Sequence, residues 1–176
     1  MNGTIIIVGG TGGVGSALAR RLASAGRKLH LIGRDKAKLE AAAGPLNATI
    51  AVADVLDKAA LTAAVQEAGA EIAGLAYAVG TINLRPIAKL TDADFENDFR
   101  LNALGAVHAV QAALPGLKAG ESTSSILLFS TVAVSQGFSA HASIAMAKGA
   151  VEGLTVSLGA ELAPKIRVNC IAPSLT

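Results

Sequence analysis

The sequence predicts an α/β fold in which a parallel sheet is covered by helices on both faces. Short aliphatic segments alternate along the 176 residues with longer segments whose apolar residues recur every three to four positions. Hydrophobic residues make up 52% of the chain and charged residues 16%, a composition typical of a globular domain. Aromatic residues are only 3%, so the core has to be built from small aliphatic side chains, which let helices approach a sheet closely.

The expected strands and helices follow one another without a linker or an internal repeat. Each strand is a short apolar run, and we expect strands at 5–8, 29–32, 49–53, 72–79, 125–129 and 166–171. Each helix has an apolar stripe, and we expect helices at about 14–25, 36–43, 58–68, 91–114 and 142–162. Gly26 is typical of a helix end, and Asp35 and Thr91 are typical of helix starts. Six strands alternating with helices indicate a doubly wound parallel sheet.

Charge and cysteine content exclude several classes of protein. The net charge is +2 and the basic residues are scattered, so we expect no nucleic-acid partner. The single cysteine, Cys170, allows no intrachain disulfide and fits a reducing compartment, so we expect a cytoplasmic protein. The N-terminal residues do not have the pattern of a signal peptide, and no run of about 18 apolar residues predicts a membrane span. We expect no metal site.

A glycine-rich segment between the first strand and the first helix is the strongest functional signal. It reads Gly9-Gly10-Thr11-Gly12-Gly13-Val14-Gly15. Glycines are needed here for a tight turn, for close approach of backbone N–H groups to a pyrophosphate, and for packing of the helix on the strand. The helix N-terminus adds partial positive charge. The absence of a Gly-Lys-Ser/Thr ending excludes a P-loop, so the segment predicts a dinucleotide bound on a Rossmann-type domain.

The end of the second strand bears on which dinucleotide is bound. Sites that prefer NAD usually place an acidic residue there, where it binds the ribose 2′-hydroxyl. Gly33 occupies this position and Arg34 follows it. Because a guanidinium pairs well with a 2′-phosphate, we expect NADP(H) in preference to NAD(H). The alternative is that Arg34 is a solvated surface residue beside the helix cap Asp35.

Over essentially its whole length the sequence resembles the short-chain dehydrogenase/reductase family. The spacing Gly9-x-x-x-Gly13-x-Gly15 and the segment Arg167-Val168-Asn169-Cys170-Ile171-Ala172-Pro173 match the compact single-domain branch. The resemblance implies the strand order 3-2-1-4-5-6. The cofactor-binding positions that we expect are Gly9, Thr11, Gly12, Gly13, Val14, Gly15, Arg34, Asp54, Val55, Gly80, Lys148 and Pro173.

The end of the fourth strand departs from the family pattern. The family carries Asn-Asn-Ala-Gly there, whereas this chain has Tyr77-Ala78-Val79-Gly80 and keeps only the glycine. We expect this change to weaken the polar contacts that the two asparagines make. Asn102, on the helix that follows, is similar to the family asparagine that holds a water in a proton relay.

The expected active site is also incomplete. The family uses a hydroxyl residue after strand five, then a Tyr as general acid/base, and a Lys four residues after the Tyr that lowers its pKa and holds the nicotinamide ribose. Thr131 and Lys148 occupy the hydroxyl and Lys positions. Ile144 stands four residues before Lys148, and an isoleucine can neither donate nor accept a proton. Tyr77, the only tyrosine of the chain, lies on another strand.

Two replacements for the tyrosine are open. If the helix extends back one turn, His141 lies seven residues before Lys148 on the same face, and an imidazole is a competent general acid/base. Ser139 and Ser143 are weaker candidates. The other possibility is hydride transfer to a polarised C=C or C=N bond, whose proton comes from water or substrate, with Lys148 mainly gripping the ribose.

We therefore expect an NAD(P)(H)-dependent oxidoreductase with altered acid/base chemistry that acts on a small-molecule substrate. The alternative is a non-catalytic NADP(H)-binding regulatory or partner protein. Residues 1–176 are expected to form a single dinucleotide-binding domain that lacks the C-terminal substrate loop and the last strand of the family. Pro173 to Thr176 resembles the start of that loop. Alternatively, strand six is a free edge at which apolar Val168 and Ile171 invite pairing with another chain.

Small residues on the two long helices bear on the oligomeric state. The two long helices carry small residues at positions that we expect to face outward, namely Ala106, Ala109, Ala113, Ala150 and Val151, and the family counterparts of these positions pack between subunits. We expect a homo-oligomer, either a dimer or a tetramer. An ordinary core face against the sheet would give the same periodicity.

Overall fold

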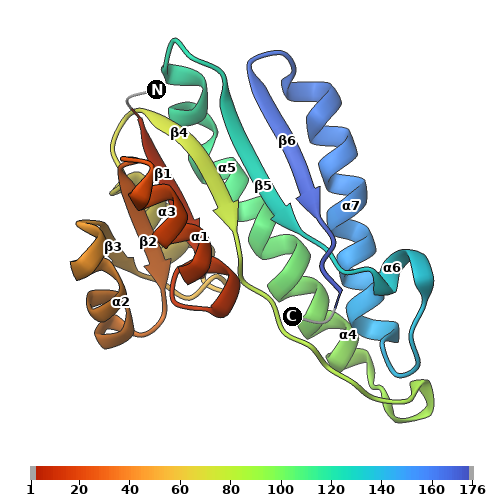
Figure 1. Ribbon diagram of the computed structural model, residues 1–176. Helices are drawn as coiled ribbons and strands as arrows, with labels where there is room; N and C mark the ends of the chain where they lie inside the picture. The colour runs from red at the N-terminus through yellow and green to blue at the C-terminus, as the bar shows by residue number, and fades with distance from the viewer. Residues whose placement is uncertain (1–2, 175–176) are drawn as a thin grey trace.

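The computed structural model describes residues 3–174 and contains a six-stranded parallel sheet of order β3-β2-β1-β4-β5-β6 (Figure 1). The expected doubly wound fold and strand order are confirmed. The strands are β1 (Thr4–Val8), β2 (Leu29–Gly33), β3 (Thr49–Val52), β4 (Ile72–Tyr77), β5 (Ser124–Phe129) and β6 (Ile166–Ile171). The helices are α1 (Gly13–Ser24), α2 (Lys36–Ala43), α3 (Lys58–Gln66), α4 (Asp92–Phe99), α5 (Gly105–Ala119), α6 (Ala133–Gln136) and α7 (Ala142–Leu162).

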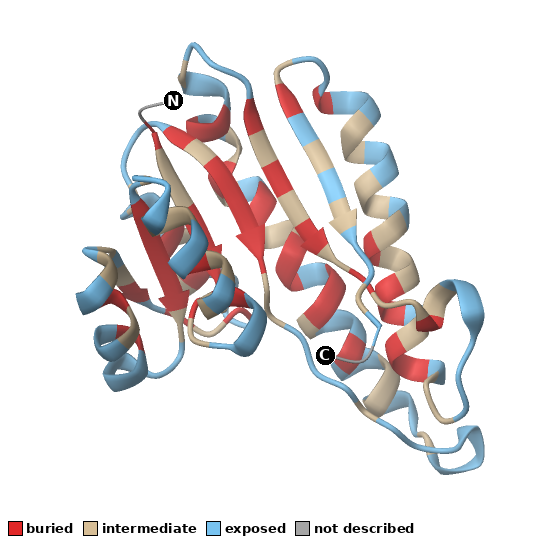
Figure 2. Cartoon of the chain, viewed as in Figure 1, coloured by how far each residue is buried: buried red, intermediate tan, exposed pale blue. Residues whose placement is uncertain are grey.

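Helices cover both faces of the sheet, with α1 and α2 on one face and α3, α5 and α7 on the other (Figure 1). The side chains of β1 alternate between the two layers. Ile6 and Val8 join the larger apolar cluster with α3 and α5, whereas Ile7 joins the smaller cluster with α1 and α2. Figure 2 shows this as a buried sheet interior inside more exposed helices. Burial on both faces explains why β1, β2 and β4 read as continuous apolar runs.

The helix boundaries that the sequence signals are confirmed where a capping residue sets them. Gly26 has φ of 69°, and the N–H of Arg27 donates to the Leu22 carbonyl, which closes the end of α1. The Asp35 carboxylate accepts from the Lys38 N–H at the start of α2. Thr91 forms a capping box with Asp94 at the start of α4.

The expected continuous helix over 91–114 is wrong. The segment divides into α4, a π-helical turn η3 (Arg100–Leu104), and α5, which continues to Ala119. Other boundaries differ by one to two residues: β4 ends at Tyr77, β3 at Val52 and α3 at Gln66. The short helix α6 and two 3₁₀ turns, η1 (Gly44–Leu46) and η2 (Ile87–Lys89), are not indicated by the sequence periodicity.

The small residues of α5 and α7 do not form an outer surface, so that expectation is also wrong. Ala106, Ala109, Ala113 and Val151 are buried in the larger core cluster, and Ala150 packs against it. They are small because they lie where the helices approach the sheet and one another. These positions give no support to a homo-oligomer.

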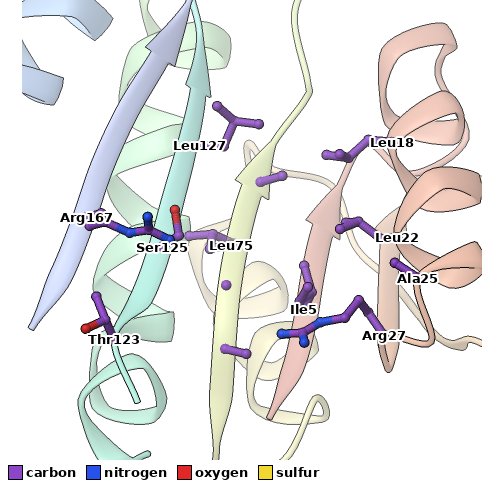
Figure 3. A pocket seen from close by; sticks show the side chains of 13 residues that line it. Ile5, Leu18, Leu22, Ala25, Arg27, Leu75, Thr123, Ser125, Leu127 and Arg167 are labelled. Carbon is purple, nitrogen blue, oxygen red and sulfur yellow. The ribbon is translucent and has the colours of Figure 1, made fainter. Parts of the chain in front are cut away.

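On the α1 side of the sheet, no helix of residues 3–174 covers β5 and β6 (Figure 1), and alternate residues of these strands are half-buried or exposed. On β5, Ile126 and Leu128 are fully buried on the α5 side, whereas Leu127 and Phe129 on the opposite side are only half-buried. An apolar pocket of about 340 Å³ lies beside Leu127. Figure 3 shows Arg27 and Arg167 among the side chains that line it.

The strand β6 forms one edge of the sheet within the described residues, and its Ile171 is 47% exposed. Of the segment expected to begin the substrate loop, Leu175 and Thr176 lie outside the described residues. Among residues 3–174 there is no helix with the length and apolarity needed to cross a bilayer.

Candidate cofactor and active site

The β1–α1 turn has the close backbone packing that its glycines predict. Gly9 has φ of 85°, in the left-handed region that favours glycine, and the Gly12 N–H donates to its carbonyl at 3.1 Å. A Cβ on Gly15 would overlap the same carbonyl. The first and last glycines of the motif are therefore required by the turn itself, whether or not a ligand is bound.

The N-terminus of α1 is open to an anion. Gly12 is the N-cap and supplies no side-chain acceptor to the first turn, which contains no acidic residue. A Cβ on Gly13 would meet nothing within 4 Å, so the space above it is free. Backbone N–H groups that lack intrahelical partners, together with the helix dipole, make such a terminus suited to phosphate.

A pocket of about 210 Å³ runs from this turn across the carboxyl ends of β2, β3 and β4. Seven of the expected cofactor residues line it: Gly9, Thr11, Gly12, Arg34, Asp54, Val55 and Gly80. Gly13 and Val14 lie exposed at the start of α1, and Lys148 and Pro173 do not line this pocket. Complete ligand pockets usually measure about 300–1,000 Å³, so this pocket would enclose only part of a dinucleotide.

Arg34 lies at the rim of this pocket and faces Asp54. Its guanidinium Nη1 is 4.0 Å from Asp54 Oδ2, and 75% of the Arg34 side chain is exposed. Asp54 also accepts from the N–H of Leu56, which fixes the carboxylate beside the strand end. An exposed pair of this kind contributes little stability, so Arg34 remains free to pair with an anionic ligand.

Asn102 lies at the centre of the π-helical turn and is fully buried. Its Nδ2 donates to the Asp98 carbonyl at 2.9 Å, but its Oδ1 has no hydrogen-bond partner within the protein. A Cβ on Gly80 would lie 2.9 Å from this Oδ1 and 3.3 Å from the Lys148 Nζ. The glycine at position 80 therefore keeps open a small space between an amide oxygen and an ammonium group.

Lys148 projects from α7 toward the end of β5. It is only 8% exposed, and its Nζ donates to the Phe129 carbonyl at 2.9 Å. Burial lowers the pKa of Lys148 from 10.5 to about 8. A buried ammonium with a single protein acceptor retains two protons for other acceptors, such as the hydroxyls of a ribose.

Thr131 follows β5 immediately beyond this point. Its Oγ1 accepts from the Ala133 N–H at 3.3 Å, which forms a local turn and leaves the hydroxyl proton free. Pro173 lies alongside, since its carbonyl accepts from the Val132 N–H. The neighbouring Ser130 is not available in this way, because its hydroxyl donates to Glu152 at 2.5 Å.

His141 is the N-cap residue of α7, so the helix begins one residue after it and does not extend back by a turn. Its Nδ1 is 2.7 Å from the Ser139 carbonyl, and its ring contacts Phe138 edge-on. The seven residues to Lys148 correspond to a rise of about 10 Å along a helix. Ile144 lies between them and is buried. The structure thus brings Gly80, Asn102 and Lys148 together and leaves His141 apart from them at the start of α7.

The hydroxyl of Tyr77 makes a hydrogen bond that the sequence does not predict. It donates to the Leu101 carbonyl at 2.6 Å and so supplies a polar contact at this end of β4. Sequence periodicity carries no signal for this contact, because it joins β4 to a turn of different helical pitch 24 residues away.

The comparisons with known proteins agree with this fold. A model of the short chain dehydrogenase family matches residues 3–176. A galactitol 2-dehydrogenase of Cereibacter sphaeroides is 34% identical over 98% of this chain and 71% of its own length. A tropinone reductase homolog of Arabidopsis thaliana is 32% identical over 97% of this chain and 68% of its own length.

A solved structure extends the likeness to the fold. A short chain dehydrogenase from Shigella flexneri 2a, determined with NADP, superposes with a TM-score of 0.91. It is 23% identical, and the match covers 98% of this chain and 77% of that one.

The sheet order and the glycine turn define a Rossmann-type domain, and the relatives are dehydrogenases and reductases. The chain belongs to the short-chain dehydrogenase/reductase family, a family that binds NAD(P).

Proposed function

We propose that this chain is an NADP(H)-dependent oxidoreductase that acts on a small organic substrate with altered acid/base chemistry. The observation that carries the proposal is the space over Gly80, which is bounded by the unpartnered Asn102 Oδ1 and the Lys148 Nζ. A buried acceptor without a partner costs free energy unless a ligand or a water satisfies it.

The residues at the cofactor pocket fit a phosphorylated dinucleotide. The open N-terminus of α1 suits the pyrophosphate, and Arg34 at the pocket rim suits a 2′-phosphate. When bound, the dinucleotide supplies or accepts a hydride at its nicotinamide ring. Gly80 and Pro173 would border the nicotinamide end, where Lys148 would hold the ribose hydroxyls.

The chain's own groups orient the substrate and move protons. The Thr131 hydroxyl, whose proton is free, would donate to the substrate oxygen or nitrogen. Asn102 Oδ1 would hold a water that connects to the Lys148 ammonium. At neutral pH the ammonium is mostly protonated because its pKa is about 8, so it can hold the proton at the inner end of such a relay.

The final proton donor is the altered part of this chemistry. Ile144 occupies the position of the family tyrosine and offers no proton. His141 is one replacement, and it would serve a substrate that extends toward the start of α7. A substrate with a polarised C=C or C=N bond would need no protein acid there, because water can supply its proton.

A non-catalytic NADP(H)-binding protein, acting as a regulator or partner subunit, is the second candidate. It is favoured by Ile144 and by Tyr77 and Ala78 at the positions of the family's two asparagines. Under this function the pocket and Arg34 keep their roles, and the space over Gly80 holds the ribose and a structural water.

A panel of carbonyl, imine and enone substrates with NADPH separates the two candidates. The enzyme proposal expects NADPH oxidation with at least one of these classes. Binding of NADPH without turnover on any class supports the regulator. In parallel, Ile144→Tyr is expected to add carbonyl reduction, with Ile144→Phe as a matched control that adds the ring without the hydroxyl.

A further inference from the structure

Tyr77 is a buried tyrosine at the end of β4 that the proposed chemistry does not use. It is 2% exposed, and its hydroxyl donates to the Leu101 carbonyl at 2.6 Å. Burial raises the pKa of Tyr77 far above its ordinary value, so the hydroxyl stays protonated and remains a donor. The hydroxyl therefore stays a hydrogen-bond donor at all ordinary pH values and does not serve as a general acid or base.

The acceptor of this bond lies inside the π-helical turn. Leu101 is the second residue of η3, and Asn102 follows it directly. Wide helical turns of this kind disturb the regular backbone hydrogen bonds and are frequent at functional sites. A donor from a neighbouring strand, aimed at a carbonyl in the turn, favours the wide turn over a regular helix.

Gly105, about one helical turn after Leu101, leaves room for the Tyr77 hydroxyl. A Cβ on Gly105 would overlap the Tyr77 hydroxyl and lie 3.0 Å from Cζ of its ring. Gly105 is buried, so neither group can move into solvent. The phenol therefore occupies a groove that only glycine at position 105 provides.

One short segment of chain thus contacts two adjacent residues of the turn. Tyr77 binds the backbone of Leu101, and Gly80, three residues later, faces the side-chain oxygen of Asn102. The first contact fixes where the turn lies, and the second depends on that position to within a few tenths of an ångström.

We propose that Tyr77 is a positioning residue of the active site, which holds the π-helical turn so that Asn102 Oδ1 faces the space beside Lys148. This role rests on the proposed function for its catalytic consequence, but not for its structural one. The phenol does not touch the space over Gly80; it acts through Leu101 and Asn102.

The test compares Tyr77→Phe with a matched control, Ser124→Ala. Ser124 is also 2% exposed, and its hydroxyl also donates to a helix carbonyl, that of Leu117 at 2.8 Å near the far end of α5. Each variant removes one buried hydrogen bond between a strand side-chain hydroxyl and a backbone carbonyl, in η3 for Tyr77 and in α5 for Ser124. Only Tyr77→Phe removes it at the turn that carries Asn102.

The direct readout is the Asn102 side-chain amide in ¹⁵N NMR spectra, with its signals assigned by their loss in Asn102→Ala. Tyr77→Phe should shift these signals and speed their solvent exchange, whereas Ser124→Ala should leave them unchanged. The kinetic readout, with the substrate class found to turn over, is a kcat roughly 10-fold or more below the parent for Tyr77→Phe. Its KM for NADPH should change less than its kcat, because the β1–α1 turn is held by its own backbone contacts.

Unchanged Asn102 signals in Tyr77→Phe, or equal kcat in the two variants, would overturn the positioning role. If the parent protein turns over no substrate, the proposed function fails, while the NMR comparison still decides whether Tyr77 positions Asn102.

Discussion

The side-chain oxygen of Asn102 faces Gly80 so closely that a Cβ on residue 80 would lie 2.9 Å from it. Asn102 comes from a helical turn and Gly80 from the end of a strand, and the contact brings the buried amide next to Lys148. The chemistry proposed for this chain depends on the space that this pair leaves open.

Gly80→Ala should fill that space. We expect a loss of turnover of roughly 10-fold or more and weaker NADPH binding, because the methyl group displaces either the amide or the ammonium. Gly153→Ala is the control, since it adds a methyl group to an exposed position of α7 where nothing lies within 4 Å. Equal kinetics and cofactor affinity in the two variants would show that the space has no function.

The buried ammonium of Lys148 should make stability depend on pH. Its pKa is about 8 in the folded chain against an ordinary 10.5, so the unfolded chain binds more protons between these values. The folded state is therefore penalised below pH 8, and the penalty is relieved as the pH rises toward 10.5.

Lys148→Met removes this ionisable group and keeps a long apolar stem. Relative to the variant, the parent should gain about 3 kcal/mol of unfolding free energy between pH 7.5 and pH 10.5. Urea unfolding at several pH values measures the difference, and the other titrating groups cancel between the two proteins. If the unfolding free energies of the parent and the variant change equally with pH, the Lys148 ammonium is not desolvated in the folded protein.

Arg34 should decide between the two dinucleotides. Arg34→Ala is expected to weaken NADPH binding roughly 10- to 100-fold, since charge-assisted hydrogen bonds contribute about 1.5–3 kcal/mol. NADH affinity should change by less than about twofold. Lys36→Ala removes an exposed positive charge two residues away and should leave both affinities unchanged. An equal loss of affinity for NADPH and NADH would show that Arg34 does not bind the 2′-phosphate.

His141 is expected to donate the proton if the substrate is a carbonyl. His141→Ala should then lower turnover by about 100-fold or more while NADPH binding is retained. Phe138→Ala is the matched control, because it removes the ring that contacts His141 and leaves the imidazole in place. Retained activity in His141→Ala would favour a proton from water or substrate.

The elements that the sequence predicts correctly have local causes. Asp35, Thr91 and Gly26 mark helix boundaries through contacts to residues within five positions. The strands are short apolar runs, and their length is typical of buried strands. The glycine turn is predictable for the same reason, since Gly9 and Gly15 contact one another across six residues.

The features that the sequence does not predict have causes far away in the chain. The π-helical turn contacts Tyr77 on another strand, and its residues have no periodicity that separates it from the helices on either side. The core positions of Ala106 and Ala109 could not be told from outer ones, because alanine suits a close helix contact on either side. The approach of Lys148 to Gly80 likewise depends on how α7 packs beside the sheet.

The most direct test of the account is a titration of the protein with NADPH, compared with Gly13→Asp and Gly13→Asn. The position is open to a side chain, and a carboxylate in the first turn of α1 favours the helix while it repels a pyrophosphate. We expect saturable binding by the parent, a weaker but measurable affinity in Gly13→Asn, and no binding by folded Gly13→Asp. Equal affinity in all three proteins, or no binding by the folded parent, would contradict a dinucleotide site on the β1–α1 turn.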